Sequence, residues 1–188
     1  MEYQLEPFNV EHAEVILGWV QAAEDRDAWA SRAHLELTPE LFCEWHADPD
    51  VHAYVLTVDG VLCGYGEVWT DEAEAEAELA RVVVPPRSRG RGVGRRLVTL
   101  LAERASELGF ADVWVRVLPT NVAALAAYAA AGFSRASADE EERFNAGQPR
   151  KYVWMRLMSP RSQSSAAVPE PGARSSSGRR SPRRRRRR

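Results

Sequence analysis

The 188-residue sequence predicts an α/β fold with a mixed, mostly antiparallel central sheet and flanking helices. Three observations lead to this prediction. Two runs rich in β-branched and aromatic residues, 51–58 and 61–70, are joined by Asp59-Gly60, a strong hairpin signal. After this hairpin, strand patterns alternate with helical ones. The chain is also 45% hydrophobic, which suffices for one core at this length.

The segment before the hairpin divides into short elements. Residues 3–8 alternate like a strand, and the apolar residues within 10–20 recur at helical spacing. The stretch Thr38-Pro39-Glu40 combines a favoured capping residue with proline at the first helical position. It predicts a third element, a helix that ends before Asp48-Pro49.

The segment after the hairpin predicts strands and helices in turn. A strand over 76–84 is stopped by Pro85-Pro86. The apolar stripe within 93–108 predicts an amphipathic helix that ends at Gly109. The remaining elements are a strand over 111–117, an alanine-rich helix over 121–131 and a terminal strand over 152–157.

Composition argues against several classes of protein. The sequence has no run of about 18 apolar residues and no signal-peptide layout, so we expect a cytoplasmic protein that does not contact a membrane. Cys43 and Cys63 lack the paired spacing of metal ligands. We therefore expect neither a disulfide framework nor a metal site.

Charge divides the chain into two parts. Residues 159–188 hold ten arginines and one acid, so they carry about +9, whereas residues 1–158 carry about −11. The later segment is rich in Ser, Pro, Gly and Arg and is predicted to be disordered. We expect one folded domain over 1–158, followed by a basic tail that makes at most a weak contact with a polyanion.

An arginine- and glycine-rich loop, 84–96, lies between a predicted strand and the start of a predicted helix. Its glycines let the backbone approach a ligand, and the first helical turn leaves N–H donors unpaired. The loop therefore predicts a site for a pyrophosphate, reinforced by arginine side chains. It lacks the third glycine of a dinucleotide fingerprint and the Lys-Ser or Lys-Thr of a Walker motif.

Two motifs carry a resemblance to a known family. The stretch Arg89-Gly90-Arg91-Gly92-Val93-Gly94, preceded by Val84-Pro85, resembles the acetyl-CoA loop of the GNAT family of N-acetyltransferases. A match shifted to start at Arg87 stays open. Asn121, Tyr128 and Gly132-Phe133 resemble a second arrangement of the same family. The resemblance covers roughly residues 3–158 and is strongest between Glu78 and Phe133.

The resemblance implies an enzyme that uses acetyl-CoA as co-substrate and no metal. The acetyl group would pass to an amine of a small molecule or a protein, by direct attack in a ternary complex. The main chain at the end of the strand over 76–84 would hold the pantetheine arm and the thioester oxygen. The implied cofactor contacts are Val82, Val83, Val84, Arg89, Gly90, Arg91, Gly92, Val93, Gly94, Arg95 and Asn121. Capping of a helix is an alternative role for Asn121.

The same resemblance implies two catalytic residues. Glu78 would act as the base that frees the amine of its proton, with Glu67 on the neighbouring strand as the alternative. Tyr128 would act as the general acid that protonates the departing thiolate. Acceptor-binding elements are expected in the N-terminal third, which holds these aromatic and imidazole side chains: Trp19, Trp29, Trp45, His34, His46 and His52. The tryptophans are more typical of a core.

Two other classes of function stay open. A catalytically silent domain that senses acyl-CoA would bind the cofactor without turnover. An interaction protein would bind nucleic acid through its arginine tail, and that binding would weaken with salt. A homodimer through the terminal strand is also left open.

Overall fold

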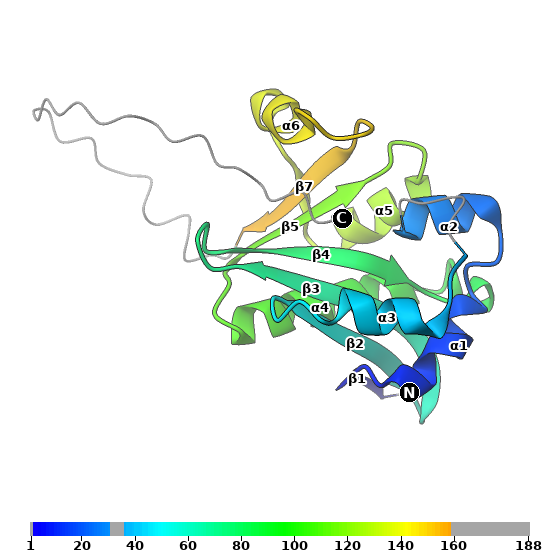
Figure 1. Ribbon diagram of the computed structural model, residues 1–188. Coiled ribbons are helices and arrows are strands. Elements are labelled where there is room, and N and C mark those ends of the chain that lie inside the picture. Colours follow the sequence, from blue (N-terminus) through cyan, green and yellow to red (C-terminus); the bar gives the residue numbers. More distant parts are fainter. Residues whose placement is uncertain (1, 31–35, 159–188) are drawn as a thin grey trace, which may run out of the picture.

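The computed structural model describes residues 2–30 and 36–158 and shows an α/β protein built on a seven-stranded sheet (Figure 1). The strand order is β1-β2-β3-β4-β5-β7-β6. Only β4 and β5 pair in parallel among these neighbours, so the predicted mixed, mostly antiparallel sheet is confirmed. The strands are Tyr3–Pro7 (β1), Val51–Val58 (β2), Val61–Asp71 (β3), Glu76–Val83 (β4), Asp112–Val117 (β5), Ser134–Arg135 (β6) and Val153–Met158 (β7).

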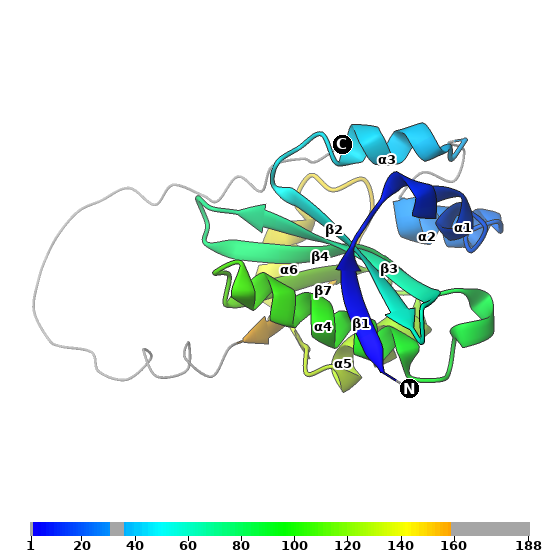
Figure 2. The ribbon, with the colours of Figure 1, turned by 90° about the horizontal axis from the view of Figure 1, so that it is seen from below.

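Helices cover both faces of the sheet. Figure 2 shows α1, α2 and α3 on one face and α4 and α5 on the other. The helix α6 packs beside β7, next to the far edge of the sheet. The helices are α1 (Ala13–Leu17), α2 (Ala23–Ala30), α3 (Pro39–Trp45), α4 (Val93–Glu107), α5 (Val122–Ala130) and α6 (Ala138–Asn145), with 3-10 turns at Val10–His12 and Pro86–Ser88. None of the described helices is long and apolar enough to cross a membrane.

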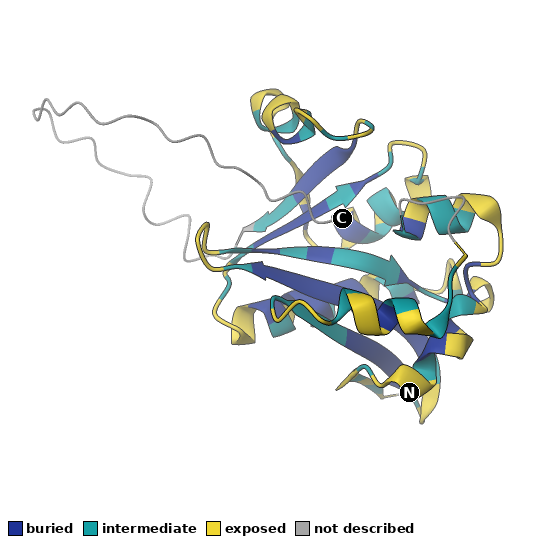
Figure 3. Cartoon of the chain, in the orientation of Figure 1, coloured by how far each residue is buried: buried dark blue, intermediate teal, exposed yellow. Residues whose placement is uncertain are grey.

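The sheet separates two main apolar clusters. One lies between the strands and α4, and the other lies between the strands and α1 to α3. The strand β3 is buried along most of its length, as its dark blue ribbon shows (Figure 3). At Gly66 a Cβ atom would lie 2.6 Å from Cδ1 of Leu101 in α4. Glycine at this position therefore lets α4 pack directly on the sheet.

Most predicted elements occur where the pattern placed them. The hairpin turn is confirmed, because Asp59 and Gly60 both have positive φ, of 49° and 76°. The predicted helix over 10–20 is broken instead into a 3-10 turn and α1. A capping box between Asn9 and His12 begins that turn, and the short α1 ends at Gly18. Thr38 occupies the N-cap position of α3, although its side chain makes no capping bond.

Three elements were not predicted: α2, β6 and α6. Of these, α6 had a readable signal, because Ser137 and Glu140 form a capping box at its start. The helix α2 buries only Trp29 and has no apolar stripe. The tail over 159–188 and its expected polyanion contact lie outside the described residues.

Candidate active site

The strand β4 leaves regular pairing at Arg81. Tyr65 of β3 pairs with Val83 of β4, and Glu67 pairs with Ala80. Between these pairs, two residues of β4, 81 and 82, lie opposite the single residue 66 of β3. Arg81 has a φ of +46°, which is unusual for a residue with a side chain. This is a β-bulge, a feature that bends a strand and re-aims its side chains.

On its other side, β4 separates from β5. The parallel pairing ends at Leu79 and Val115, although β4 continues to Val83 and β5 to Val117. Within the described part of the chain, the backbone of β4 from residue 80 onward therefore has no strand neighbour on the side of β5. The two strands splay apart at the ends that α2 and α5 flank (Figure 1).

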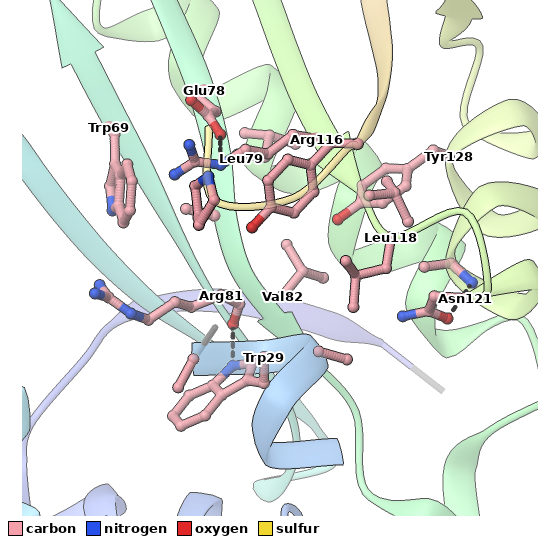
Figure 4. Close-up of a pocket in the computed structure, with 17 residues that line it drawn as sticks. Trp29, Trp69, Glu78, Leu79, Arg81, Val82, Arg116, Leu118, Asn121 and Tyr128 are labelled. Carbon is pink, nitrogen blue, oxygen red and sulfur yellow. Dashed lines mark hydrogen bonds and ion pairs between the residues drawn. The ribbon is translucent and has the colours of Figure 1, made fainter. Parts of the chain in front are cut away.

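A cavity of about 270 Å³ occupies this opening (Figure 4). It is lined by the bulged part of β4, the end of β5, one side of α5, the end of α2 and the segment before β7. Its side chains include Trp29, Trp69, Glu78, Arg81, Val82, Arg116, Leu118, Asn121, Tyr128 and Tyr152. Both proposed catalytic residues, Glu78 and Tyr128, therefore lie in one cavity.

Tyr128 lies buried on α5. Its aromatic ring packs edge-on against Phe133, with 5.7 Å between the ring centroids. Its hydroxyl points toward the middle of the cavity (Figure 4). Burial raises the pKa of this phenol, and the charge of Glu78 raises it further. Tyr128 therefore stays protonated at neutral pH, and its hydroxyl can donate a hydrogen bond.

Glu78 is paired with an arginine from the neighbouring strand. Nε of Arg116 lies 2.9 Å from Oε1 of Glu78, and the two side chains are 26% and 14% exposed. The dashed line in Figure 4 marks this ion pair. Arg116 was not singled out from the sequence, although a charged residue inside the apolar strand 112–117 was a visible signal.

Glu67, the alternative base, is fully buried and is not among the residues that line the cavity. Its Oε1 accepts a hydrogen bond of 2.5 Å from the hydroxyl of Tyr65. Its Oε2 accepts bonds of 2.6 Å from Nε1 of Trp69 and from Nη1 of Arg81. His46 completes this cluster around Glu67, with Nε2 3.5 Å from Oε1. Both oxygens are thus occupied by neighbours.

The glycine-rich loop forms the start of α4. Gly90 and Gly92 have φ values of 72° and 80°, and Gly92 is the N-cap of that helix. A Cβ atom at either position would have no neighbour within 4 Å. The glycines are therefore needed for backbone conformation, and the space above them is open for a ligand. The N-terminus of a 15-residue helix favours an anion there.

The other expected cofactor contacts are distributed around this loop. Val82 lines the cavity, Val83 is buried against α1 to α3, and Val84 lies just beyond the end of β4. Asn121 lines the cavity and also caps α5, because its Oδ1 accepts a bond of 3.1 Å from the N–H of Ala124. The capping role is thus confirmed. Arg89 pairs with Asp25 of α2 at 3.2 Å.

The aromatic residues of the N-terminal third divide between core and cavity. Trp19 is buried in the core, whereas Trp29 lines the cavity and donates a bond of 2.6 Å from Nε1 to the carbonyl of Arg81. His46 belongs to the Glu67 cluster, and His34 lies outside the described residues. Within residues 2–30 and 36–158, no group of three or more His, Cys, Asp or Glu side chains could hold a metal ion.

Comparisons with known proteins agree on a family. Over 88 residues the chain is 32% identical to the streptothricin acetyltransferase of Streptomyces lavendulae, covering 46% of this chain and 47% of that protein. Over 84 residues it is 36% identical to the [ribosomal protein bS18]-alanine N-acetyltransferase of Escherichia coli K12, covering 45% and 55%. The chain thus spans about half the length of the curated relatives it matches.

Solved structures share the fold at lower identity. The aminoglycoside acetyltransferase AAC(6')-Ib with coenzyme A superposes with a TM-score of 0.68 at 17% identity, over 88% of this chain and 99% of that chain. The spermidine N-acetyltransferase of Vibrio cholerae, in complex with CoA and spermine, superposes with a TM-score of 0.63 at 16% identity. The match covers 82% of this chain and 92% of that chain.

The model of the Acetyltransferase (GNAT) family matches residues 19–133, which is more than half of the chain. This match includes the bulged strand, the glycine-rich loop and the helix of Tyr128. The chain therefore belongs to the GNAT family of acetyltransferases.

Proposed function

We propose that this protein is an N-acetyltransferase that moves the acetyl group of acetyl-CoA to an amine by direct attack in a ternary complex. The observation that carries the proposal is the convergence of Glu78 and Tyr128 on one cavity where β4 and β5 separate. The relatives named above are acetyltransferases, and solved neighbours contain CoA, which supports acetyl-CoA as the co-substrate.

The cofactor would bind along the open side of β4. The glycine-rich loop fits its pyrophosphate, because the space around Gly90 and Gly92 at the start of α4 is open. The main chain of β4 after Leu79, where the pairing with β5 has ended, fits the pantetheine arm and the thioester oxygen. A thioester carbonyl that accepts a backbone N–H there would be more electrophilic.

The reaction needs a neutral amine and a protonated leaving group. Glu78 would take a proton from the acceptor's ammonium, directly or through water, and the nitrogen lone pair would attack the thioester carbon. The C–S bond then breaks, Tyr128 would protonate the departing thiolate, and the second proton that leaves the nitrogen would return to the Tyr128 phenolate. The geometry favours Glu78 over Glu67 as the base, since Glu67 is not among the residues that line the cavity and its oxygens are occupied.

The test is thermal unfolding of the full chain with and without acetyl-CoA, followed by a CoA-release assay with a panel of amines. A ligand that binds only the native state adds about 2.7 kcal/mol at a hundredfold excess over its Kd. We expect stabilisation by acetyl-CoA, none by NAD or ATP, and turnover with at least one amine. Stabilisation without turnover would support a silent acyl-CoA sensor instead, and no stabilisation would reject the cofactor.

A further inference from the structure

Glu78 and Arg116 place opposite charges side by side in the cavity. Their side chains meet through Nε and Oε1 at 2.9 Å, and both line the cavity between Trp69 and Tyr128 (Figure 4). An amine substrate must bring its ammonium to Glu78 if that residue is the base. The guanidinium of Arg116 then lies next to the group that the acceptor carries one or two atoms from its amine nitrogen.

Arg116 is held in position by aromatic rings. Its guanidinium carbon lies 5.7 Å from the ring centroids of Trp69 and Tyr152, and 5.9 Å from that of Trp154. These distances allow cation–π attraction, which orients the guanidinium without occupying its N–H groups. Because Nε is the atom that meets Glu78, the terminal nitrogens are suited to a second carboxylate.

The charge of the cavity wall argues against a polycationic acceptor. Among the described residues that line it, Glu78 is the one carboxylate, whereas Arg81 and Arg116 are both cationic. The guanidinium of Arg81 is already paired with buried Glu67. A second ammonium on the acceptor would find no other carboxylate among these described residues and would meet Arg116.

The remaining walls are apolar or aromatic. Trp29, Trp69 and Tyr152 supply rings, and Leu79, Val82 and Leu118 supply aliphatic surface. The volume of about 270 Å³ lies just below the usual range of ligand pockets, which limits the acceptor to a small molecule. The site thus combines a paired anion and cation with an apolar surround.

We propose that the acceptor is a free α-amino acid with an apolar or aromatic side chain, bound with its ammonium at Glu78 and its carboxylate at Arg116. This inference rests on the proposed function. A zwitterion matches the Glu78–Arg116 pair charge for charge, and the side chain packs against the rings. Arg116 is then a specificity-determining residue, since it contacts the acceptor's carboxylate and not the reacting atoms.

The test compares two acceptors that differ only in the carboxylate. L-Phenylalanine and L-phenylalaninamide are assayed by CoA release with the full chain and with Arg116→Gln. We expect the ratio of kcat/KM for the acid to that for the amide to fall about 30-fold or more in Arg116→Gln, because only the acid loses a charged contact. Arg104→Gln, which alters a surface arginine paired with Glu107, is the matched control and should leave the ratio unchanged.

The ratio separates specificity from general damage. Equal losses for both acceptors in Arg116→Gln would mean that Arg116 only supports the fold or Glu78, and would overturn the inference. Faster acetylation of spermidine or an aminoglycoside than of any amino acid by the wild-type chain would also overturn it, while leaving the proposed function intact. Binding of acetyl-CoA without turnover of any amine would reject the proposed function itself, and this inference with it.

Discussion

Arg81 and Glu67 form a buried ion pair directly beside the bulge in β4. Nη1 of Arg81 lies 2.6 Å from Oε2 of Glu67, and the side chains are 10% and 0% exposed. The same Arg81 has a positive φ and stacks its guanidinium 3.8 Å above the ring of Trp45. Side-chain bonds thus stabilise the backbone conformation that opens β4 toward the cavity.

The first prediction concerns Glu67→Gln. Removing the carboxylate leaves the Arg81 charge buried without its partner, so we expect the free energy of unfolding to fall by about 3 kcal/mol. Urea denaturation of the wild type and the variant measures this difference. The control is Glu72→Gln, an exposed acid in the turn after β3, which should change stability by less than about 0.5 kcal/mol.

Stability of the wild type should also depend on pH through Glu67. Burial alone would raise the pKa of Glu67, but the hydrogen bond with His46, the charge of Arg81 and the bonds from Tyr65 and Trp69 lower it overall. A lowered pKa stabilises the fold above the unfolded value of 4.5 and loses that contribution as pH falls below it. The difference in free energy of unfolding between the wild type and Glu67→Gln should therefore become smaller below pH 4.5. A difference that stays constant would contradict an ionised Glu67.

Local patterns predicted much of the fold and part of the site. The hairpin at Asp59-Gly60 and the glycine-rich loop before α4 are contiguous signals, because the residues that form them are neighbours in the chain. The Arg116–Glu78 pair was not predictable in this way, since it joins residues 38 positions apart through the parallel register of β4 and β5. The prediction of one continuous helix over 10–20 was wrong for a different reason, because apolar spacing does not show where a short helix stops.

The second prediction concerns Gly92→Glu. The residue has a φ of +80° at the N-cap of α4, so a side chain there is strained and projects into the proposed phosphate site. We expect a stability loss of about 1–2 kcal/mol and no thermal stabilisation by acetyl-CoA. Gly60→Glu is the control, because Gly60 has a φ of +76° and an equally open surround in the β2–β3 turn. It should lose similar stability yet keep the full response to acetyl-CoA; retained affinity in Gly92→Glu would remove the loop from the site.

The third prediction concerns Tyr128→Phe. Loss of the hydroxyl should lower kcat about 100-fold while the Kd for acetyl-CoA changes little, because the ring remains packed against Phe133. The raised pKa of Tyr128 means that the wild type should not lose activity through this phenol as pH rises to 10. Steady-state rates across pH and calorimetric titration of acetyl-CoA measure both effects. Tyr54→Phe, on β2, is the control and should keep the kcat and the Kd for acetyl-CoA of the wild type. Unchanged turnover in Tyr128→Phe would reject the acid role.

The last prediction concerns Asp25, whose carboxylate lies 3.2 Å from Nη2 of Arg89 at the glycine-rich loop. Both side chains are partly exposed, so their ion pair contributes at most about 1 kcal/mol. The pyrophosphate of acetyl-CoA would compete with Asp25 for Arg89 and would be repelled by the same carboxylate. We therefore expect Asp25→Asn to tighten acetyl-CoA binding about two- to fivefold at low salt, with the gain fading as ionic strength rises.

Asp27→Asn is the matched control for this effect. It makes the same change of charge on the same helix, but Asp27 pairs with Arg150 and not with the loop. Titration calorimetry at two salt concentrations should show tightening in Asp25→Asn alone. Equal tightening in both variants would assign the gain to the overall charge of α2, and weaker binding in Asp25→Asn would mean that Asp25 holds Arg89 in its binding position instead of competing for it.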